Sequence, residues 1–253
     1  MPWTLPESDG ELLRLAKGYP YTAAGGSYLF ADGVARPLTN DLFGPALFGG
    51  RTPVIGHGSN RSPEQLARKF GSGATIPVSR AWLEDYDVVY SAHMTRYGAI
   101  AANLRHTPGT RVEVWVAWLT GDQLAYMHRT ELGAEIYCYG SLKGAGIALE
   151  AGPSDWIDAA GVYLSTYGYL TRDGAPIPLA AVAAEGRAGP GLPQEAALAL
   201  VRDRYRPGRQ LEELILAKIR DPARRKALIA EMRAQALPPH APHFVPIEVV
   251  SDS

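Results

Sequence analysis

The hydrophobic positions of the chain gather in short runs that are rich in β-branched and aromatic residues, a pattern typical of strands. We interpret as strands the runs at residues 88–90, 99–104, 112–119, 136–139 and 162–166. The periodicity also predicts a short amphipathic helix over residues 10–17 and a hairpin through residues 28–34. The strongly charged stretch 209–236 predicts further helices.

These elements divide the chain into three segments. Residues 1–50 form an N-terminal accessory segment, residues 51–205 a domain of mixed strands and helices, and residues 206–253 a C-terminal helical extension with a proline-rich tail. No internal repeat is found in the sequence. The pattern therefore predicts an α+β fold with an extension at each end.

Composition narrows the class of protein. The 253 residues are enough to bury a sizeable core. The 25 basic and 26 acidic residues leave a formal net charge of -1, so we expect no nucleic-acid partner and no attraction to a membrane surface. The single cysteine excludes an internal disulfide framework, and the sequence has neither an apolar spanning stretch nor the features of a signal peptide. We expect a soluble, cytoplasmic protein.

The segment 56–60, Gly-His-Gly-Ser-Asn, joins an extended apolar run to a helix whose start is clearly marked. Ser62 is a good N-cap, Pro63 suits the first helical position, and Gln65 would complete a Ser-x-x-Gln capping box. Backbone N–H groups ahead of a helix favour a carboxylate or a phosphate. The segment is therefore a candidate anion site, although an ordinary strand-to-helix turn would carry the same features.

An amphipathic helix is predicted over residues 120–131, where a Thr-Gly-Asp-Gln capping box marks the start. Its spacing puts Glu131 on the same face as Met127 and His128. Burial and the helix dipole would both raise the pKa of a carboxyl group at this end, which suits a general base working near neutral pH. Alternatively, Glu131 points into water or pairs with His128 or Arg129.

Several segments, taken in order, resemble the γ-glutamylcyclotransferase family. They are 56–60 (Gly-His-Gly-Ser-Asn), 96–104 (Arg-Tyr-Gly-Ala-Ile-Ala-Ala-Asn-Leu), 108–115 (Pro-Gly-Thr-Arg-Val-Glu-Val-Trp) and 127–131 (Met-His-Arg-Thr-Glu). The 71 positions from Asn60 to Glu131 are similar to the separation in that family. Pro-Ile-Pro at 176–178 and Gly-Leu-Pro at 191–193 extend the resemblance, which covers about residues 52–204.

Members of that family fold as a small mixed β-barrel with flanking helices, so the resemblance implies this architecture for residues 51–205. It also implies a reaction that converts a γ-glutamyl amine or peptide into 5-oxoproline and releases the amine, with no metal and no cofactor. Backbone groups of Gly58, Ser59 and Asn60 would hold the α-carboxylate of the γ-glutamyl group. Glu131 would take a proton from the α-ammonium and return one to the leaving amine.

His57, Tyr137 and Tyr163 complete the set of substrate-binding residues that the resemblance implies. Tyr163 lies in a predicted strand, as a family tyrosine does, and Tyr137 follows Glu131 as another family tyrosine follows the catalytic glutamate. The family has tyrosine at the first position of the loop, whereas this chain has His57, whose imidazole is smaller and titratable. The partner would be a small γ-glutamyl molecule, and the leaving group stays open.

Other candidate sites have less support. The chain has no Gly-x-Ser-x-Gly motif, which argues against a serine hydrolase. His240 and His243 lie in the proline-rich tail without a third metal ligand, and Cys138 fits a small core residue in a strand. The loop-like string 139–142 follows a predicted strand but lacks a helix start after it.

Two alternatives to a simple monomeric enzyme remain at this point. A non-catalytic module that binds γ-glutamyl or carboxylate groups would have the same loop and the same fold. The charged helices after residue 209 could form the surface of a homodimer.

Overall fold

The structure, a computed structural model, describes residues 3–38, 45–132 and 136–249. Its helices are α1 (Asp9–Lys17), α2 (Pro45–Phe48), α3 (Pro63–Phe70), α4 (Gly121–Leu132), α5 (Gln194–Tyr205), α6 (Leu211–Arg220) and α7 (Pro222–Ala234), together with a short 3-10 helix, η2 (Ser59–Arg61). Its strands are β1 (Tyr28–Ala31), β2 (Val34–Pro37), β3 (Thr52–Gly56), β4 (Ile76–Met94), β5 (Ile100–Leu119), β6 (Tyr137–Leu149), β7 (Trp156–Ser165), β8 (Thr171–Arg172), β9 (Ala175–Pro176), β10 (Ala184–Glu185) and β11 (Phe244–Pro246). The segment boundaries expected at residues 1 and 253 lie outside the described residues.

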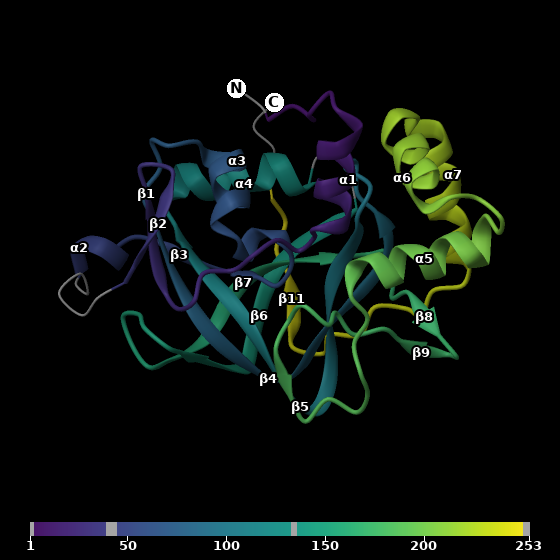
Figure 1. Cartoon of the computed structure of the whole chain (residues 1–253). Coiled ribbons are helices and arrows are strands. Elements are labelled where there is room, and N and C mark those ends of the chain that lie inside the picture. Colours follow the sequence, from purple (N-terminus) through teal and green to yellow (C-terminus); the bar gives the residue numbers. More distant parts are fainter. Residues whose placement is uncertain (1–2, 39–44, 133–135, 250–253) are drawn as a thin grey trace.

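Within the described ranges the strands close into a five-stranded barrel. Its order is β5-β3-β7-β6-β4, and the barrel closes because β4 also pairs with β5. Strands β3 and β7 run parallel, whereas the other neighbours in the barrel are antiparallel. The expected α+β fold with a small mixed β-barrel is therefore confirmed. Helices α1, α3 and α4 lie across one end of the barrel, and α5, α6 and α7 lie at its side (Figure 1).

Strands β4 and β5 form a long antiparallel pair that differs from the sequence expectation. The pattern predicts separate strands at residues 99–104 and 112–119, but β5 runs through both without interruption. The register shifts where residues 107–110 of β5 stand opposite Asp85 of β4, which has a φ of 57° and accepts a hydrogen bond from the Gly109 N–H at 2.8 Å. A bulge of this kind bends a strand without ending it, so the prediction of two strands was wrong.

Local sequence signals explain two elements. The Thr120 N–H donates to Oε1 of Gln123 at 3.0 Å, and the Gln123 N–H donates to Oγ1 of Thr120 at 3.3 Å. The capping box predicted at the start of α4 is therefore confirmed. In the hairpin of β1 and β2, Asp32 and Gly33 have φ values of 54° and 79°, the turn geometry that matches the twist of paired strands.

The helices that carry the candidate site are anchored on the outer face of the barrel. Leu66 of α3 and Met127 of α4 are buried in one hydrophobic cluster with Trp115 of β5. Their exposed fractions are 0%, 1% and 1%, so a shift of either helix would open a cavity in this cluster.

None of the helices in the described ranges is long and apolar enough to cross a membrane.

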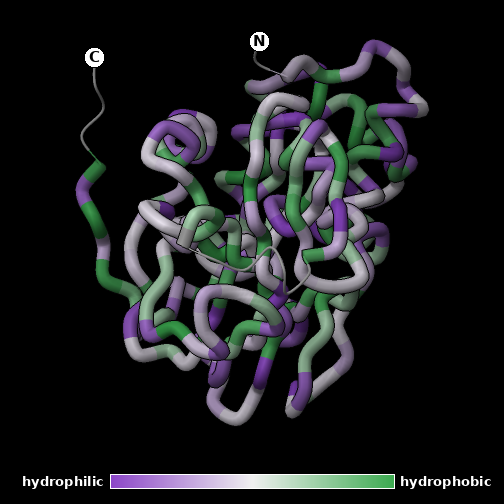
Figure 2. Tube along the Cα trace, turned by 90° about the vertical axis from the view of Figure 1, so that its left-hand side faces the viewer, coloured by the Kyte–Doolittle hydropathy of each residue, from purple (hydrophilic) through white to green (hydrophobic). Residues whose placement is uncertain are grey.

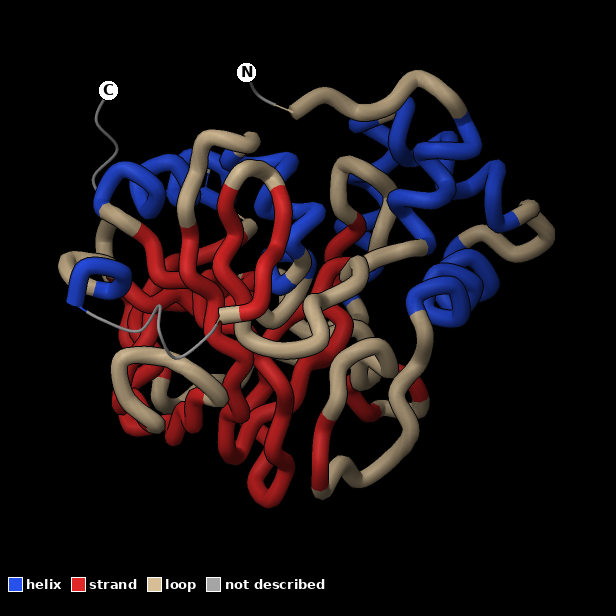
Figure 3. The backbone as a smooth tube through the Cα atoms, turned by 60° about the vertical axis from the view of Figure 1, so that its left-hand side comes forward, coloured by secondary structure: helices blue, strands red, loops and turns tan. Residues whose placement is uncertain are grey.

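The two terminal segments pack against each other beside the barrel. Nζ of Lys17 in α1 lies 2.8 Å from Oε1 of Glu195 in α5 and 2.5 Å from Oε1 of Glu212 in α6. Asp9 of α1 also pairs with Arg220 of α6. Figure 3 shows these helices gathered above and to the right of the strands. Because α1 reaches the barrel end as well, it links the C-terminal helices to the end where the candidate site lies.

The proline-rich tail lies along the barrel and contains a strand that the sequence analysis did not predict. This strand, β11, pairs with β6. The tail is further held by the His240 carbonyl, which accepts a hydrogen bond from the His106 N–H at 2.9 Å. Val245 and Ile247 are 45% and 46% exposed, and the hydrophobic stretch near the C-terminus is visible on the outside of the molecule in Figure 2.

Candidate active site

A cavity of about 420 Å³ opens between the barrel end and the helices α3 and α4. Every residue that the sequence analysis assigned to the site lines this cavity: His57, Gly58, Ser59, Asn60, Glu131, Tyr137 and Tyr163. They come from the loop after β3, from α4, and from strands β6 and β7. The N-terminal segment also reaches the cavity wall, through Trp3 and Tyr19.

The loop after β3 leads into η2 and then into α3. Ser62 is the N-cap of α3 and Pro63 its first residue, as predicted. The capping box was wrong, because the Ser62 side chain makes no hydrogen bond to the helix. The Gln65 N–H instead donates to the backbone oxygen of Ser62 at 3.1 Å, and Oε1 of Gln65 accepts from Arg68 at 3.2 Å. The backbone oxygen of Ser62 therefore takes the place of its hydroxyl as the acceptor for the Gln65 N–H.

The carbonyl groups of the loop bond forward along the chain. The Gly58 oxygen accepts from the Arg61 N–H at 3.3 Å, and the Ser59 oxygen accepts from the Ser62 N–H at 3.0 Å. The first N–H groups of such a helical turn have no acceptor within the turn itself. The anion-binding role of this loop stays a prediction.

Steric crowding explains why the loop has a glycine at position 58. A Cβ atom there would clash with the hydroxyl oxygen of Tyr19, whose ring belongs to the N-terminal segment. That hydroxyl accepts a hydrogen bond from the Ala102 N–H of β5 at 2.8 Å and is buried. The close approach of the loop to Tyr19 thus closes one wall of the cavity.

Gly58→Ala is expected to destabilise the protein by about 1–3 kcal/mol, because Tyr19 must shift and its hydrogen bond with Ala102 weakens. Urea unfolding followed by circular dichroism measures the change. Gly73→Ala is the matched control, since a Cβ at Gly73 meets nothing within 4 Å. In a Tyr19→Phe background the same Gly58 substitution should cost less, and an equal cost in both backgrounds would exclude this clash as the cause.

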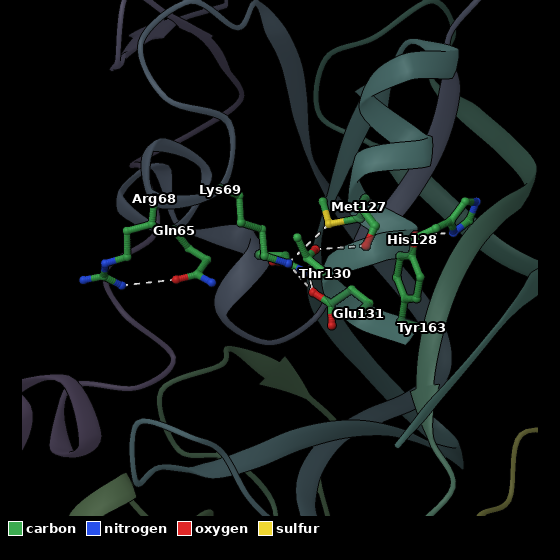
Figure 4. Close-up of polar contacts among 9 residues, drawn as sticks. Gln65, Arg68, Lys69, Met127, His128, Thr130, Glu131 and Tyr163 are labelled. Atoms are coloured by element: carbon green, nitrogen blue, oxygen red, sulfur yellow. Dashed lines mark hydrogen bonds and ion pairs between the residues drawn. The ribbon is translucent and has the colours of Figure 1, made fainter. Parts of the chain in front are cut away.

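Glu131 lies in the cavity with its side chain 16% exposed. Its Oε1 accepts a hydrogen bond from Nδ2 of Asn60 at 3.0 Å and forms an ion pair with Nζ of Lys69 (Figure 4). The alternatives of an exposed glutamate or a pair with a neighbour on its own helix are thus wrong. Arg129 stacks over Tyr126, with the guanidinium carbon 5.4 Å from the ring centroid.

The direction of the Glu131 pKa is the opposite of the sequence prediction. Burial raises this pKa, as expected, but the attraction of Lys69 and the hydrogen bonds from Lys69 and Asn60 outweigh burial. The nearby His57 acts in the same direction as these contacts. Glu131 is therefore held below its ordinary pKa, as a carboxylate.

Lys69 was not predicted from the sequence as a residue of the site. Gln65, Arg68 and Lys69 follow the spacing i, i+3, i+4, so all of them lie on one face of α3 and line the cavity. This spacing could have identified a cationic face next to the loop. The sequence gives no signal, however, that this face would meet Glu131 across the cavity.

Two buried histidines face the same cavity. His57 is 7% exposed and His93 is 5% exposed, and burial lowers the pKa of each to about 4. Glu131 opposes the shift in both cases but is the weaker influence, and for His93 the charge of Arg225 adds to burial. The imidazole expected to titrate near neutral pH is thus a neutral group in the folded protein.

Several tyrosines complete the wall. Burial raises the pKa of Tyr137 well above its ordinary value and that of Tyr97, which the sequence analysis did not assign to the site, to about 12. The charge of Glu131 contributes in the same direction for both. The Tyr163 hydroxyl lies 2.8 Å from Nδ1 of His128. The phenols of Tyr97 and Tyr137 are therefore neutral groups that can donate a hydrogen bond into the cavity.

The other candidate residues lie elsewhere. Cys138 is half-buried in β6, where burial raises the pKa of its thiol, and the string 139–142 lies inside β6 instead of after a strand. The rings of His240 and His243 lie 5.5 Å and 5.6 Å from His106. In the part of the chain that the structure describes, no group of three or more His, Cys, Asp or Glu side chains is placed to hold a metal ion.

No family model matches the sequence, and no curated protein matches it. Solved structures with a similar course of the chain include a γ-glutamyl cyclotransferase, at 21% identity and a TM-score of 0.37, over 46% of this chain and 67% of that one. A protein from Arabidopsis thaliana has 17% identity and a TM-score of 0.35, over 46% of this chain and 69% of its own. An uncharacterized protein from Homo sapiens has 16% identity and a TM-score of 0.37, over 66% of this chain and 88% of its own. At such identities and TM-scores these likenesses concern the fold alone.

Proposed function

We propose that the chain is a γ-glutamylcyclotransferase-like enzyme that converts a γ-glutamyl amine or peptide into 5-oxoproline. The observation that supports this proposal is the 3.0 Å contact between Asn60, in the anion-binding loop, and the Glu131 carboxylate, inside a cavity of about 420 Å³. A γ-glutamyl group carries a carboxylate and an ammonium on the same carbon atom. A site for it therefore requires an anion-binding group and a carboxylate side by side, and the loop at 58–60 and Glu131 are our candidates for these two roles.

The residues suit the steps of the reaction. The loop N–H groups at 58–60 hold the α-carboxylate, and Glu131 accepts a proton from the α-ammonium. The freed amine attacks the γ-carbonyl carbon of the same glutamyl group, so a C–N bond forms and the carbonyl oxygen becomes an oxyanion. Protonated Glu131 then gives its proton to the leaving nitrogen, and the bond between the γ-carbon and that nitrogen breaks as the carbonyl group re-forms. The ring nitrogen still carries one proton too many, which the regenerated Glu131 carboxylate removes and passes to the released amine, so the products are a neutral lactam and an ammonium.

The enzyme needs little more than positioning for this chemistry, because the nucleophile and the carbonyl group belong to the same molecule. The neutral phenols of Tyr97 and Tyr137 are suitable donors to the oxyanion, since a group with a raised pKa retains its proton near neutral pH. Arg68 and Arg96 also line the cavity, and their guanidinium carbons lie 5.5 Å and 4.9 Å from the centroid of the Trp3 ring.

The proposal is tested with the purified full chain and a panel of γ-glutamyl amino acids, γ-glutamyl amines and glutathione. We expect release of 5-oxoproline, detected by NMR or chromatography, from at least one of these compounds. Absence of product across the whole panel would contradict the enzymatic proposal.

A non-catalytic binding module is the second candidate, and one observation favours it. The Lys69 ammonium already pairs with the Glu131 carboxylate, the group that the α-ammonium of a substrate would need. A module of this kind would bind glutamate or 5-oxoproline, measurable by calorimetry, without releasing product from any γ-glutamyl compound.

A further inference from the structure

We infer that Lys69 is a positioning residue that keeps Glu131 charged and oriented, and that it gives up its place to the α-ammonium of the substrate. This inference rests on the proposed function for the exchange with substrate. The part that concerns Lys69 and Glu131 alone rests on their contact and can be tested without any turnover.

Burial and a second contact hold Lys69 in place beside Glu131. Lys69 and Glu131 have side chains that are 11% and 16% exposed, so neither is free to move into bulk water. Nζ of Lys69 also lies 3.3 Å from Sδ of Met127, one turn before Glu131 on α4 (Figure 4). Because α3 continues directly from the loop and η2, Lys69 and the anion-binding loop belong to one continuous piece of backbone.

Lys69 is the group around Glu131 that carries a positive charge near pH 7. The titratable groups that face Glu131 are Lys69, His57, His93, Tyr97, Tyr137 and Tyr163. The imidazoles and the phenols in this set are neutral near pH 7, because burial disfavours their charged forms. Among these groups, Lys69 provides the positive charge that opposes the effect of burial on Glu131.

The need for an ionised general base explains why a cation lies beside Glu131. A buried glutamate without a cation nearby tends to stay protonated, and a protonated carboxyl cannot accept a proton. The Lys69 ammonium and the α-ammonium of a substrate are the same kind of group, so one can replace the other without leaving the carboxylate unpaired. The displaced Lys69 then lies beside the substrate, where a carboxylate or the developing oxyanion is a partner of opposite charge.

The test compares Lys69→Met, which removes the charge but keeps most of the length, with Lys69→Arg, which keeps the charge. Arg36→Met is the control, because it removes a cation from β2, outside the cavity. An NMR titration of carbon-13-labelled glutamate side chains measures the pKa of Glu131 in each protein. The pKa is expected to rise in Lys69→Met, to stay low in Lys69→Arg, and to be unchanged in Arg36→Met.

The pH profile of kcat/KM for 5-oxoproline release gives the second readout. In Lys69→Met the loss should be about tenfold or more at acidic pH and should diminish as the pH rises, since the acidic limb moves to higher pH. An unchanged Glu131 pKa in folded Lys69→Met would overturn the inference. Higher turnover of Lys69→Met at every pH would also overturn it, because Lys69 would then be a blocking group. If the pKa rises but wild type releases no product, the positioning role stands and the cyclisation fails.

Discussion

Glu131→Gln is expected to lower kcat/KM for 5-oxoproline release by about 10²–10⁴-fold, the usual contribution of a general acid–base. Glutamine retains an oxygen that can accept from Asn60, but it cannot take a proton from the α-ammonium. Because the same group both removes and returns the proton, one substitution affects both steps of the reaction. Steady-state assays over a range of pH measure the loss, which should persist at every pH.

The control for this variant concerns Lys69. Removing the carboxylate leaves the Lys69 ammonium, 11% exposed, without its ion-pair partner, which destabilises a protein by itself. The double variant Lys69→Met/Glu131→Gln removes both charges and should recover part of the stability while remaining inactive. Activity in the range of wild type in either glutamine variant, with the fold intact by circular dichroism, would falsify the role of Glu131.

Acid is expected to destabilise the fold as the pH falls from about 6.5 to about 4, because His57 and His93 are buried as neutral groups. In the unfolded chain each imidazole takes up a proton near its ordinary pKa of 6.5, whereas in the folded protein it does so only near 4. Between these values the unfolded state binds more protons, so the free energy of unfolding falls with the pH. The difference amounts to about 3 kcal/mol for each histidine, at about 1.4 kcal/mol per pH unit.

Urea unfolding at pH values from about 7 to about 4.5 measures this dependence. His57→Gln/His93→Phe removes both titratable rings, and the double variant should lose most of the decline in this pH range. Each single variant should lose about half, since burial is the main cause for each ring. A double variant with the same slope as wild type would show that other groups dominate. Glu131 is separable from this effect, because a lowered carboxyl pKa costs stability only at pH values below its ordinary value of 4.5.

The sequence was most informative where the signal is local. The capping box at Thr120 and Gln123 and the N-cap position of Ser62 depend on residues within one helical turn, so the helices of the site could be predicted. The hairpin at residues 28–34 follows for the same reason. At Ser62 the predicted helix start was right but the predicted hydrogen bond was wrong, because the Gln65 N–H donates to the backbone oxygen of Ser62 instead of its hydroxyl.

The candidate site was predicted as a set of residues but not as an electrostatic unit. Asn60 and Glu131, 71 positions apart, both line the cavity, but the hydrogen bond between their side chains was not predicted. Lys69 was absent from the prediction, and with it the direction of the Glu131 pKa. The effects of burial and of the helix dipole on the Glu131 pKa can be predicted from α4 alone. The ion pair with Lys69 can be predicted only when α3 and α4 are known to lie side by side.

By itself, the sequence determined the starts of α3 and α4, the turn residues of the first hairpin and a small set of polar side chains that suit acid–base chemistry beside an anion. These depend on backbone geometry and on spacing along one element. The tertiary structure alone decided that β5 continues past Gly109, that Tyr19 closes the wall behind Gly58, and that Lys69 reaches Glu131. The physical reason is that the protonation state of a buried group depends on the sum of burial and nearby charges, and those charges come from distant parts of the chain.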